Sequence, residues 1–283
     1  MKSILHLSDV HFGRVDYATL KPLIAAAHTL SPDVVVVSGD LTQRARSEEY
    51  MEAREFLEEL PEPQIVVPGN HDIPLYNPIA RFLKPREKFD KFITSERMPF
   101  YGDTDIAIVG VNSSRSFTTK YGRINVQQLS EIENRFSLAE PSAIRCVVTH
   151  HPFDLPKSDT HLKQIIGRSK VAMRELARMK IDLFLSGHLH QGFTSGTSTR
   201  YKIDHYNALI VQAGTATSTR GRGEPNSFNL ILVEPPSIAV KRFVWNPAGL
   251  QFDERSVETF ERGETGWQPF ANRPGEGSGP VAS

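Results

Sequence analysis

The stretch SILHLSDVH, Ser3 to His11, indicates the fold, because a short β-like run (Ser3 to Leu7) leads directly into the polar turn Asp9-Val10-His11. The same succession recurs along the chain. The further β-like runs that are followed within a few residues by Asp, Asn or His are Val34 to Val37, Gln64 to Val67, Ile144 to Thr149 and Leu183 to Leu185. A sixth run, Ile106 to Val111, is followed by Asn112. The pattern predicts strands whose carboxyl ends carry the chemistry.

Stretches of helical period separate these runs. Leu20 and Ile24 share a helical face, as do Tyr50 and Leu57. A third helix is expected around Leu129 and Ile132, with Asn125 as its N-cap. Strands alternating with helices predict βαβ units around a largely parallel sheet, so the polar turns should converge at one edge.

Three regions depart from this alternation. After Gly192 a meander of short strands is expected, and we interpret it as a second sheet packed on the first: Arg200 to Ile203, Ala208 to Gln212, Phe228 to Val233 and Ala239 to Trp245. Residues 73–101 interrupt the alternation of strands and helices, and we expect them to form a helical excursion over one rim of the sheet. The glycine- and proline-rich residues 261–283 predict a disordered tail after a domain that spans residues 1–260.

The polar turns contain the residue types that bind divalent transition metals. Asp9-x-His11 and His188-x-His190 have a spacing of two, which in an extended loop sends both side chains the same way. Imidazole and carboxylate suit borderline metals, and two adjacent metals need a shared two-oxygen ligand, for which Asp40 is the natural candidate. The sequence therefore predicts a dinuclear site, with one histidine of His150-His151 as a ligand and the other packed behind it.

Composition excludes several classes of protein. The chain has 33 basic and 33 acidic side chains among 283 residues, so the excess positive charge typical of duplex binding is missing. Its single cysteine, Cys146, forms no intrachain disulfide. No apolar run approaches a membrane span, and the first residues lack the regions of a signal peptide, so a cytoplasmic location without membrane contact is expected.

In these motifs the sequence resembles the calcineurin-like metallophosphoesterases, and within them the bacterial class III cyclic-nucleotide phosphodiesterases. The matching blocks are Asp9-x-His11, Gly39-Asp40, Gly69-Asn70-His71-Asp72, His150 and Gly187-His188-x-His190. The resemblance implies an α/β fold, a four-layer αββα sandwich of two mixed sheets flanked by helices, with a small helical cap. It also implies two divalent transition metals (Mn, Fe, Zn or Co), one held by Asp9, His11, Asp40 and His190 and the other by Asp40, Asn70, His150 and His188.

Such a site suits phosphate esters. Two metals bring four positive charges, Asp9 and Asp40 remove two, and a bridging hydroxide nucleophile removes one, which leaves net positive charge facing an anion. His71 is the candidate general acid, with Asp72 orienting its ring; the alternative is that His71 only stabilises charge. Asn112, Arg220 and Arg222 are candidate substrate contacts.

The excursion has two interpretations. Its bases exceed its acids by three, and Phe82, Phe89 and Phe92 are interleaved with them. They form either a lid over a nucleobase or lipid, or a helix with a solvated charged face and a buried aromatic stripe.

The leading hypothesis is a dinuclear-metal phosphodiesterase that hydrolyses a small phosphodiester, most simply a cyclic nucleotide, through a metal-bridging hydroxide. A nuclease or phosphomonoesterase of the same fold and a non-catalytic binding scaffold are the alternatives. The oligomeric state is open, with a homodimer among the options.

Overall fold

The computed structural model describes residues 1–75, 77–118, 120–156, 164–220 and 223–270. One sheet has seven strands in the order β13-β12-β11-β10-β1-β2-β3. Its strands are β1 (Lys2–Leu7), β2 (Val34–Val37), β3 (Gln64–Val66), β10 (Ser227–Glu234), β11 (Ser237–Asn246), β12 (Gln251–Gly263) and β13 (Gly266–Pro269). β1 to β3 run parallel, and β1 pairs on its other side with β10 in antiparallel register.

The other sheet has six strands in the order β4-β5-β6-β7-β9-β8. These are β4 (Phe100–Gly102), β5 (Ile106–Gly110), β6 (Ile144–Val148), β7 (Leu183–Ser186), β8 (Phe193–Gly196) and β9 (Leu209–Gln212). β5, β6, β7 and β9 are parallel, and the outer strands β4 and β8 are antiparallel to their neighbours. Both sheets are therefore mixed.

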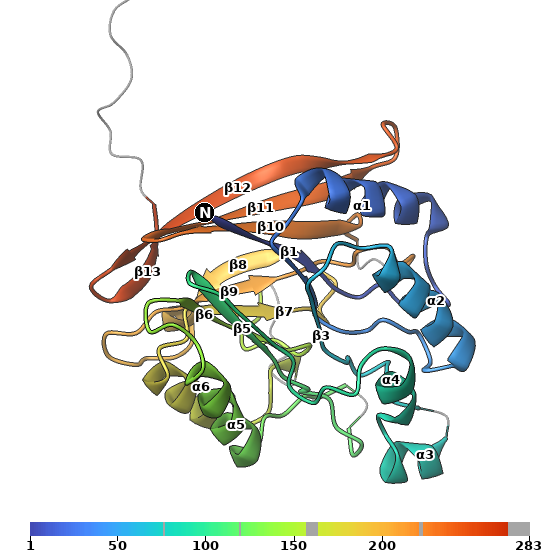
Figure 1. The fold of residues 1–283 in the computed structure, drawn as a ribbon, viewed down its shortest axis with the longest axis horizontal. Helices are drawn as coiled ribbons and strands as arrows, with labels where there is room; N and C mark the ends of the chain where they lie inside the picture. The colour runs from blue at the N-terminus through green and yellow to red at the C-terminus, as the bar shows by residue number, and fades with distance from the viewer. Residues whose placement is uncertain (76, 119, 157–163, 221–222, 271–283) are drawn as a thin grey trace, which may run out of the picture.

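Helices cover the outer face of each sheet (Figure 1). The helices are α1 (Tyr17–Leu30), α2 (Ser47–Glu58), α3 (Pro78–Leu83), α4 (Glu87–Phe92), α5 (Val126–Phe136), α6 (Ser169–Arg178) and the 3-10 turn η2 (Thr197–Thr199). Asn125 caps α5 as expected, since its side chain accepts the Gln128 N–H. One apolar cluster joins α1 and α2 to the first sheet, and a second joins α5 and α6 to the other.

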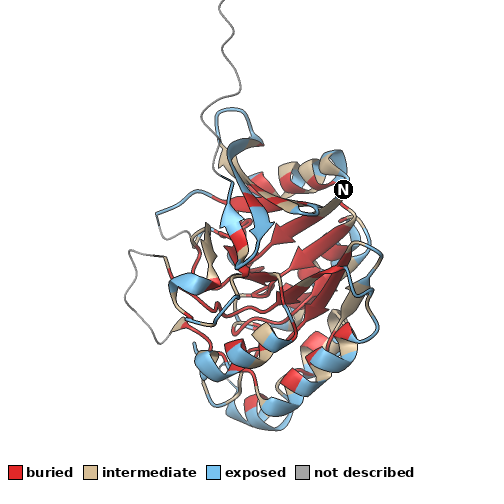
Figure 2. Ribbon diagram, turned by 90° about the vertical axis from the view of Figure 1, so that its left-hand side faces the viewer, coloured by how far each residue is buried: buried red, intermediate tan, exposed pale blue. Residues whose placement is uncertain are grey.

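The central core lies between the two sheets, and Figure 2 shows the buried strands enclosed by helices whose outer faces are exposed. Alternate strand residues such as Ile4, Ile108 and Leu183 fill this layer from both sides. The order helix, sheet, sheet, helix confirms the four-layer sandwich that the family resemblance implies.

The strand predictions are confirmed for all six runs, but the interpretation of the meander as a separate sheet is wrong. β8 and β9 extend the sheet of β5 to β7, whereas β10 to β13 extend the sheet of β1 to β3. The later strands divide between the two sheets because β10, from the C-terminal part of the chain, pairs with the edge of β1 that β2 leaves open. Residues 200–203, expected as a strand, are irregular and follow η2. Helix α6 was not predicted.

The predicted tail begins too early. β12 continues to Gly263 and β13 follows, with Trp267 only 2% exposed and its indole N–H donating to Asp182. The prediction of disorder is therefore wrong for residues 261–270, since a buried tryptophan anchors them. Residues 271–283 lie outside the described residues.

The excursion contains α3 and α4, and α4 lies beside α2 (Figure 1). Phe89 is buried in the α1–α2 cluster, and Phe92 stacks on Tyr50 with ring centroids 6.0 Å apart. These two rings support the interpretation as a buried stripe. Phe82 is exposed and contacts Phe117.

Candidate metal centre

The polar turns at the strand ends have strained backbones. Five residues predicted as ligands have positive φ values, between 53° and 78°, a region that side chains other than glycine seldom occupy. They are Asp9, His11, Asp40, His188 and His190. Strain of this kind persists only where surrounding contacts impose it, and it concentrates at functional sites.

Two glycines allow these turns to approach one another. A Cβ on Gly187 would lie 1.7 Å from the Ser8 hydroxyl oxygen and 2.5 Å from an Asp9 carboxylate oxygen. A Cβ on Gly69 would lie 2.0 Å from Asp40 Oδ1. Larger residues at either position would therefore separate loops that come from different strands.

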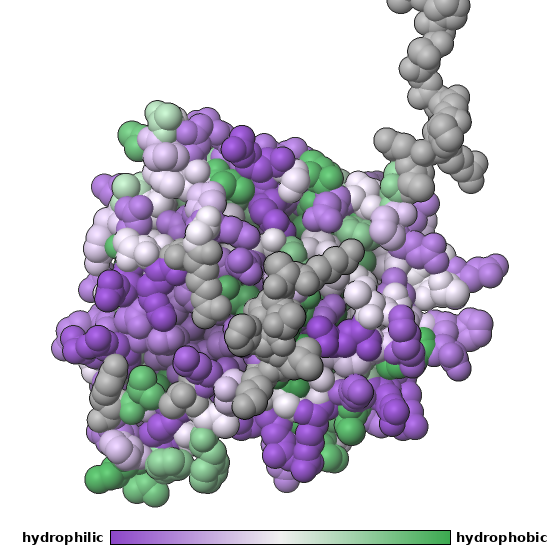
Figure 3. Space-filling model, turned by 180° about the vertical axis from the view of Figure 1, so that it is seen from behind, coloured by the Kyte–Doolittle hydropathy of each residue, from purple (hydrophilic) through white to green (hydrophobic). Residues whose placement is uncertain are grey.

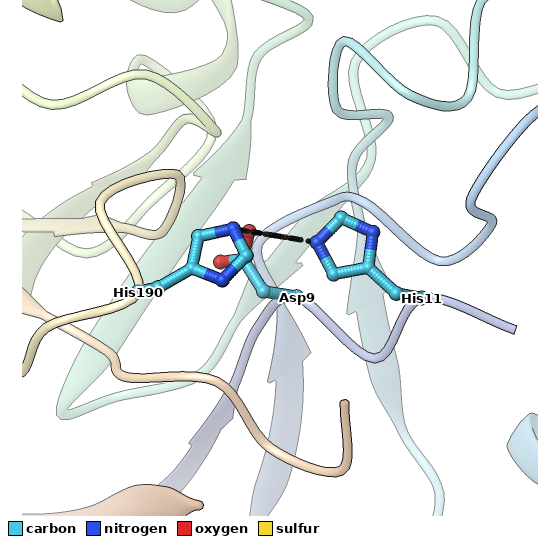
Figure 4. Close-up of side chains that lie close together, drawn as sticks. All are labelled: Asp9, His11 and His190. Carbon is cyan, nitrogen blue, oxygen red and sulfur yellow. Dashed lines mark hydrogen bonds and ion pairs between the residues drawn. The ribbon is translucent and has the colours of Figure 1, made fainter. Parts of the chain in front are cut away.

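Asp9, His11 and His190 form the first group of side chains, which point toward one another in Figure 4. Asp9 Oδ1 lies 3.6 Å from His11 Nε2 and 3.4 Å from His190 Nε2, and the two nitrogens are 3.4 Å apart. The other Asp9 oxygen accepts the Ser8 hydroxyl and the His188 N–H. One carboxylate oxygen is thus held by the protein and the other faces the two imidazoles.

The second group forms around His150. Its Nε2 lies 3.3 Å from Asp40 Oδ2, 3.2 Å from Asn70 Oδ1 and 3.3 Å from His188 Nδ1. Its Nδ1 donates to the Ser38 carbonyl at 2.8 Å, so Nε2 is the nitrogen that faces the group. Backbone acceptors commonly orient metal-binding imidazoles in this way.

Asp40 lies between the two groups. Its Oδ2 is 3.3 Å from His150 Nε2 and 3.7 Å from His11 Nε2, and its Oδ1 accepts the His71 N–H at 2.9 Å. The carboxylate is therefore within reach of both groups, as a bridging ligand must be.

These distances fit divalent cations. Ligands about 2.1 Å from a common centre are separated by about 3.0 to 3.4 Å, which matches most of the spacings in both groups. Asp9 Oδ1 is buried and accepts no hydrogen bond from the described part of the chain. The Nε2 atoms of His11 and His190, 3.4 Å apart, lie at a spacing that suits either one shared hydrogen bond or two lone pairs directed at a cation. The residues present fit two metals.

The electrostatics point the same way. Burial opposes the charged forms of both Asp40 and His150, but their mutual attraction holds the pKa of Asp40 well below its usual range and raises the pKa of His150 to about 9. For His188, burial and then the neighbouring His150 lower the pKa to about 3. A cation bound here would replace the His150 proton as the partner of Asp40.

His71 lies at the edge of the first group, with its ring 5.0 Å from that of His11. Its Nδ1 is 2.8 Å from the Gln43 carbonyl, an acceptor, so Nδ1 carries the proton. Its Nε2 accepts an N–H from Arg220 at 3.1 Å, and the same Arg220 nitrogen also donates to Gln43 Oε1 at 3.3 Å. The His71 ring is therefore held between a carbonyl and a guanidinium.

The prediction that Asp72 orients the His71 ring is wrong, because Gln43 makes that contact. The Asp72 carboxylate instead accepts backbone N–H groups from Leu41, Thr42 and Gly69. Burial and the nearby Asp40 raise the pKa of Asp72 despite these bonds. Asp72 joins the turns after β2 and β3.

The remaining predicted residues direct their polar atoms to other partners or lie outside the described residues. His151 bonds to Ser113, with Nδ1 at 2.8 Å from the hydroxyl, and packs behind His150. Asn112 uses its side-chain oxygen to accept the Ser114 N–H in a local turn. Arg222 lies outside the described residues. Sequence reasoning missed Gln43, since a lone glutamine three residues after Asp40 carries no recognisable signal.

A four-layer sandwich with this cluster of carboxylates and imidazoles at its rim defines the class of metal-dependent phosphoric ester hydrolases. The sequence model of the calcineurin-like phosphoesterases matches residues 2–192, and the chain belongs to that family.

Two relatives illustrate the similarity. A probable cyclic nucleotide phosphodiesterase of Synechococcus is 28% identical over 69% of this chain and 75% of its own length. A probable glycerophosphodiester phosphodiesterase of Arcobacter nitrofigilis is 25% identical over 96% of this chain and 98% of its own. Among solved structures, a dimetal phosphatase from Danio rerio has a TM-score of 0.62 at 13% identity, covering 85% of this chain and 95% of that one. The last comparison supports the fold alone.

Proposed function

We propose that the protein is a dinuclear-metal phosphodiesterase that hydrolyses small phosphodiesters, with a cyclic nucleotide as the leading substrate. The observation that carries the proposal is the position of Asp40, whose carboxylate oxygen lies within 3.7 Å of an imidazole from each ligand group. Cyclic nucleotide phosphodiesterases among the relatives support the substrate class.

The proposal assigns Asp9, His11 and His190 to one metal and Asn70, His150 and His188 to the other, with Asp40 shared. Two divalent cations held there would supply Lewis-acid activation of the phosphoryl group and would lower the pKa of the attacking water toward neutrality. The protein holds the ligand atoms in place before the cations arrive. Ser38 fixes the His150 ring, while Ser8 and the His188 N–H fix the Asp9 carboxylate.

Arg220 and His71 act together in this proposal. The His71 Nε2 already accepts an N–H from Arg220, so it carries no proton to donate to a leaving group. This contact favours the alternative in which His71 stabilises charge, by aiming the guanidinium at the phosphoryl oxygens. A guanidinium donates strong charge-assisted hydrogen bonds to phosphate.

Glycerophosphodiesters are a second candidate substrate class. The Arcobacter relative named for this activity aligns over 96% of this chain and 98% of its own, including the strands after residue 192 that the family match does not reach. Arg220, which contacts His71 at the site, lies in this region after residue 192.

The experiment that tests the proposal is a substrate panel with protein loaded with Mn²⁺, Co²⁺ or Zn²⁺ and assayed for metal content. The panel comprises 3′,5′-cyclic AMP, glycerophosphocholine, a nitrophenyl bis-ester, a nitrophenyl monoester and double-stranded DNA. We expect two metals per chain and faster turnover of small diesters than of the monoester or DNA. Preference for the monoester, or for DNA, would contradict the proposal.

A second experiment separates the two roles of His71. If it stabilises charge through Arg220, then His71→Ala and Arg220→Ala should each lower kcat by about 10²-fold, and the double variant should lose little more. The losses should be similar for alkyl and nitrophenolate leaving groups. A loss in His71→Ala that appears only with the alkyl leaving group would restore the general-acid role.

A further inference from the structure

Outside the metal centre, two segments form an exposed apolar surface. Six of its large apolar side chains lie in residues 74–86 and 113–123, and we call this the α3 surface: Leu75, Ile79, Phe82, Leu83, Phe117 and Tyr121. In Figure 3 apolar atoms gather at the lower left of the molecule, where α3 lies. Contiguous exposed apolar groups on a folded protein mark interaction sites.

The side chains project from one face of a short helix. Ile79, Phe82 and Leu83 follow the i, i+3, i+4 spacing, and Ile79 and Leu83 are 73% and 77% exposed. Phe117, 88% exposed, reaches this face from the other segment, with its ring 5.3 Å from that of Phe82. Within the described part of the chain, no packing contact covers the outer sides of Ile79, Leu83 and Phe117.

A buried arginine fixes the two segments together. Arg81 points inward from α3, is 5% exposed, and donates to the carbonyls of Pro74, Arg115, Ser116 and Thr118. All these acceptors are carbonyl oxygens, and no ion pair with a carboxylate neutralises this positive charge among the residues that the structure describes. The apolar face is therefore rigidly presented, and a cation lies beneath it.

The charge of this region is one-sided. Residues 74–86 and 113–123 contain six Lys or Arg and no Asp or Glu, although the whole chain has equal numbers of both signs. Lys84 pairs with Glu87 and the buried Arg86 pairs with Asp90, both partners lying just beyond the first segment. Lys120 and Arg123, in the second segment, are exposed. Exposed aliphatic groups on segments that also carry exposed cations are complementary to an anionic lipid surface, where apolar side chains insert and cations contact headgroups.

The surface starts at the metal centre. Residues 74–86 begin two positions after Asp72, which joins the ligand turns. The other segment begins at Ser113, which is bonded to His151. Ser113 and Phe117 are four residues apart, a distance of at most about 14 Å. A partner bound here would therefore lie beside the metal rim.

We infer that the α3 surface docks the protein peripherally on an anionic lipid bilayer, in contrast to the expectation from the sequence that the protein has no membrane contact. None of the helices in the described ranges combines the length and apolar composition that crossing a bilayer requires. Lipid explains the surface better than single-stranded nucleic acid does, because the most exposed helical positions are aliphatic and the Phe82 and Phe117 rings pack on each other. The inference goes beyond the proposed activity and does not depend on its substrate.

The test is cosedimentation of the full-length protein with vesicles of phosphatidylcholine, with or without phosphatidylglycerol. We expect binding to the anionic vesicles that weakens with salt. Two variants should lower the affinity at least about tenfold, since surface cations and inserted side chains both contribute. They are Ile79→Gln/Leu83→Gln/Phe117→Gln and Lys120→Gln/Arg123→Gln.

Matched controls change the same residue types elsewhere. Leu138→Gln/Val171→Gln removes apolar groups that are 72% and 55% exposed, and Lys170→Gln/Arg174→Gln removes cations on α6. Both should bind vesicles like the unchanged protein. Turnover of a soluble bis-ester, measured for every variant, reports separately on folding and on the proposed activity.

Three results would overturn the inference. The first is no binding to anionic vesicles, or binding that all four variants retain. The second is loss of an oligomer in the α3-surface variants without vesicle binding, which would make the surface a contact between copies. The third is binding of a single-stranded oligonucleotide, in place of vesicles, that the same variants lose.

Discussion

The metal rim and the α3 surface depart from ordinary burial in opposite directions. The rim buries carboxylates and imidazoles, such as Asp9 and His11, at 0% exposure, whereas the α3 surface exposes Leu83 and Phe117. Elsewhere the sheets bury valine, isoleucine and leucine as expected. Buried charges and exposed apolar side chains both lower the stability of the isolated chain. A bound cation would compensate this cost at the rim, and a bound partner would compensate it at the α3 surface. Residues whose burial or exposure is unfavourable for the isolated chain therefore indicate where this protein binds other molecules.

The largest expected effect tests the rim. Asp40→Ala should reduce turnover by more than about 10³-fold and lower metal content to one equivalent or fewer, because both ligand groups lose the carboxylate they share. Metal analysis after gel filtration, with assays on a bis-ester, measures both. Asp154→Ala is the matched control, since Asp154 is equally buried but pairs with Arg200. It should lower the melting temperature and keep both metals. Two tightly bound metals in Asp40→Ala would refute the bridging position.

The next effect tests whether the excursion is core or lid. Phe89→Ala should lower the free energy of unfolding by about 3 to 4 kcal/mol, because a fully buried ring leaves a cavity. Phe82→Ala, at a half-exposed ring, should cost less than about 1 kcal/mol. Denaturant unfolding measures both values. If Phe89→Ala instead raised KM for a cyclic nucleotide with stability unchanged, the lid interpretation would return.

A smaller effect concerns backbone approach at the rim. Gly187→Ala should reduce turnover by about 10²-fold without removing a ligand, because the added Cβ would lie 1.7 Å from the Ser8 hydroxyl and displace the Asp9 turn. Gly263→Ala, whose Cβ would have no neighbour closer than 3.7 Å, should leave turnover unchanged. Similar activity in the two variants would contradict this prediction, because it would show that the loops around Gly187 and Ser8 can move apart without loss of turnover.

The smallest effect is acid sensitivity from His6, which lies between the sheets with Nε2 bonded to Ser38. Burial lowers the pKa of His6 to about 3, so its contribution is complete above the unfolded value near 6.5 and is lost progressively below it. The unfolded chain binds the proton first, and metal-free protein should therefore lose about 2 kcal/mol from this group between pH 8 and pH 5. His6→Gln should be less stable throughout but lose less on acidification. An unchanged slope would assign the sensitivity to other groups.

Much of the fold was predictable because its signals are local. Runs such as Val34 to Val37 are too short and too β-branched for helices, and Asn125 has the side chain that caps a helix. The ligand turns were also predictable, because each follows a strand directly. The Gln43 contact to His71 was not, since it depends on the path of a loop.

The sequence by itself determined the strands of the two parallel cores, the order of the polar turns and the residue types that suit metals, because strand period and side-chain chemistry act over a few neighbours. Tertiary structure alone decided which sheet each later strand joins, which of His150 and His151 faces Asp40, and that Arg220 contacts His71. These outcomes depend on backbone edges and side chains far apart in the chain; Arg220 and His71, for example, are separated by 149 positions. No local pattern encodes such a pairing, and it is set only when the two sheets pack.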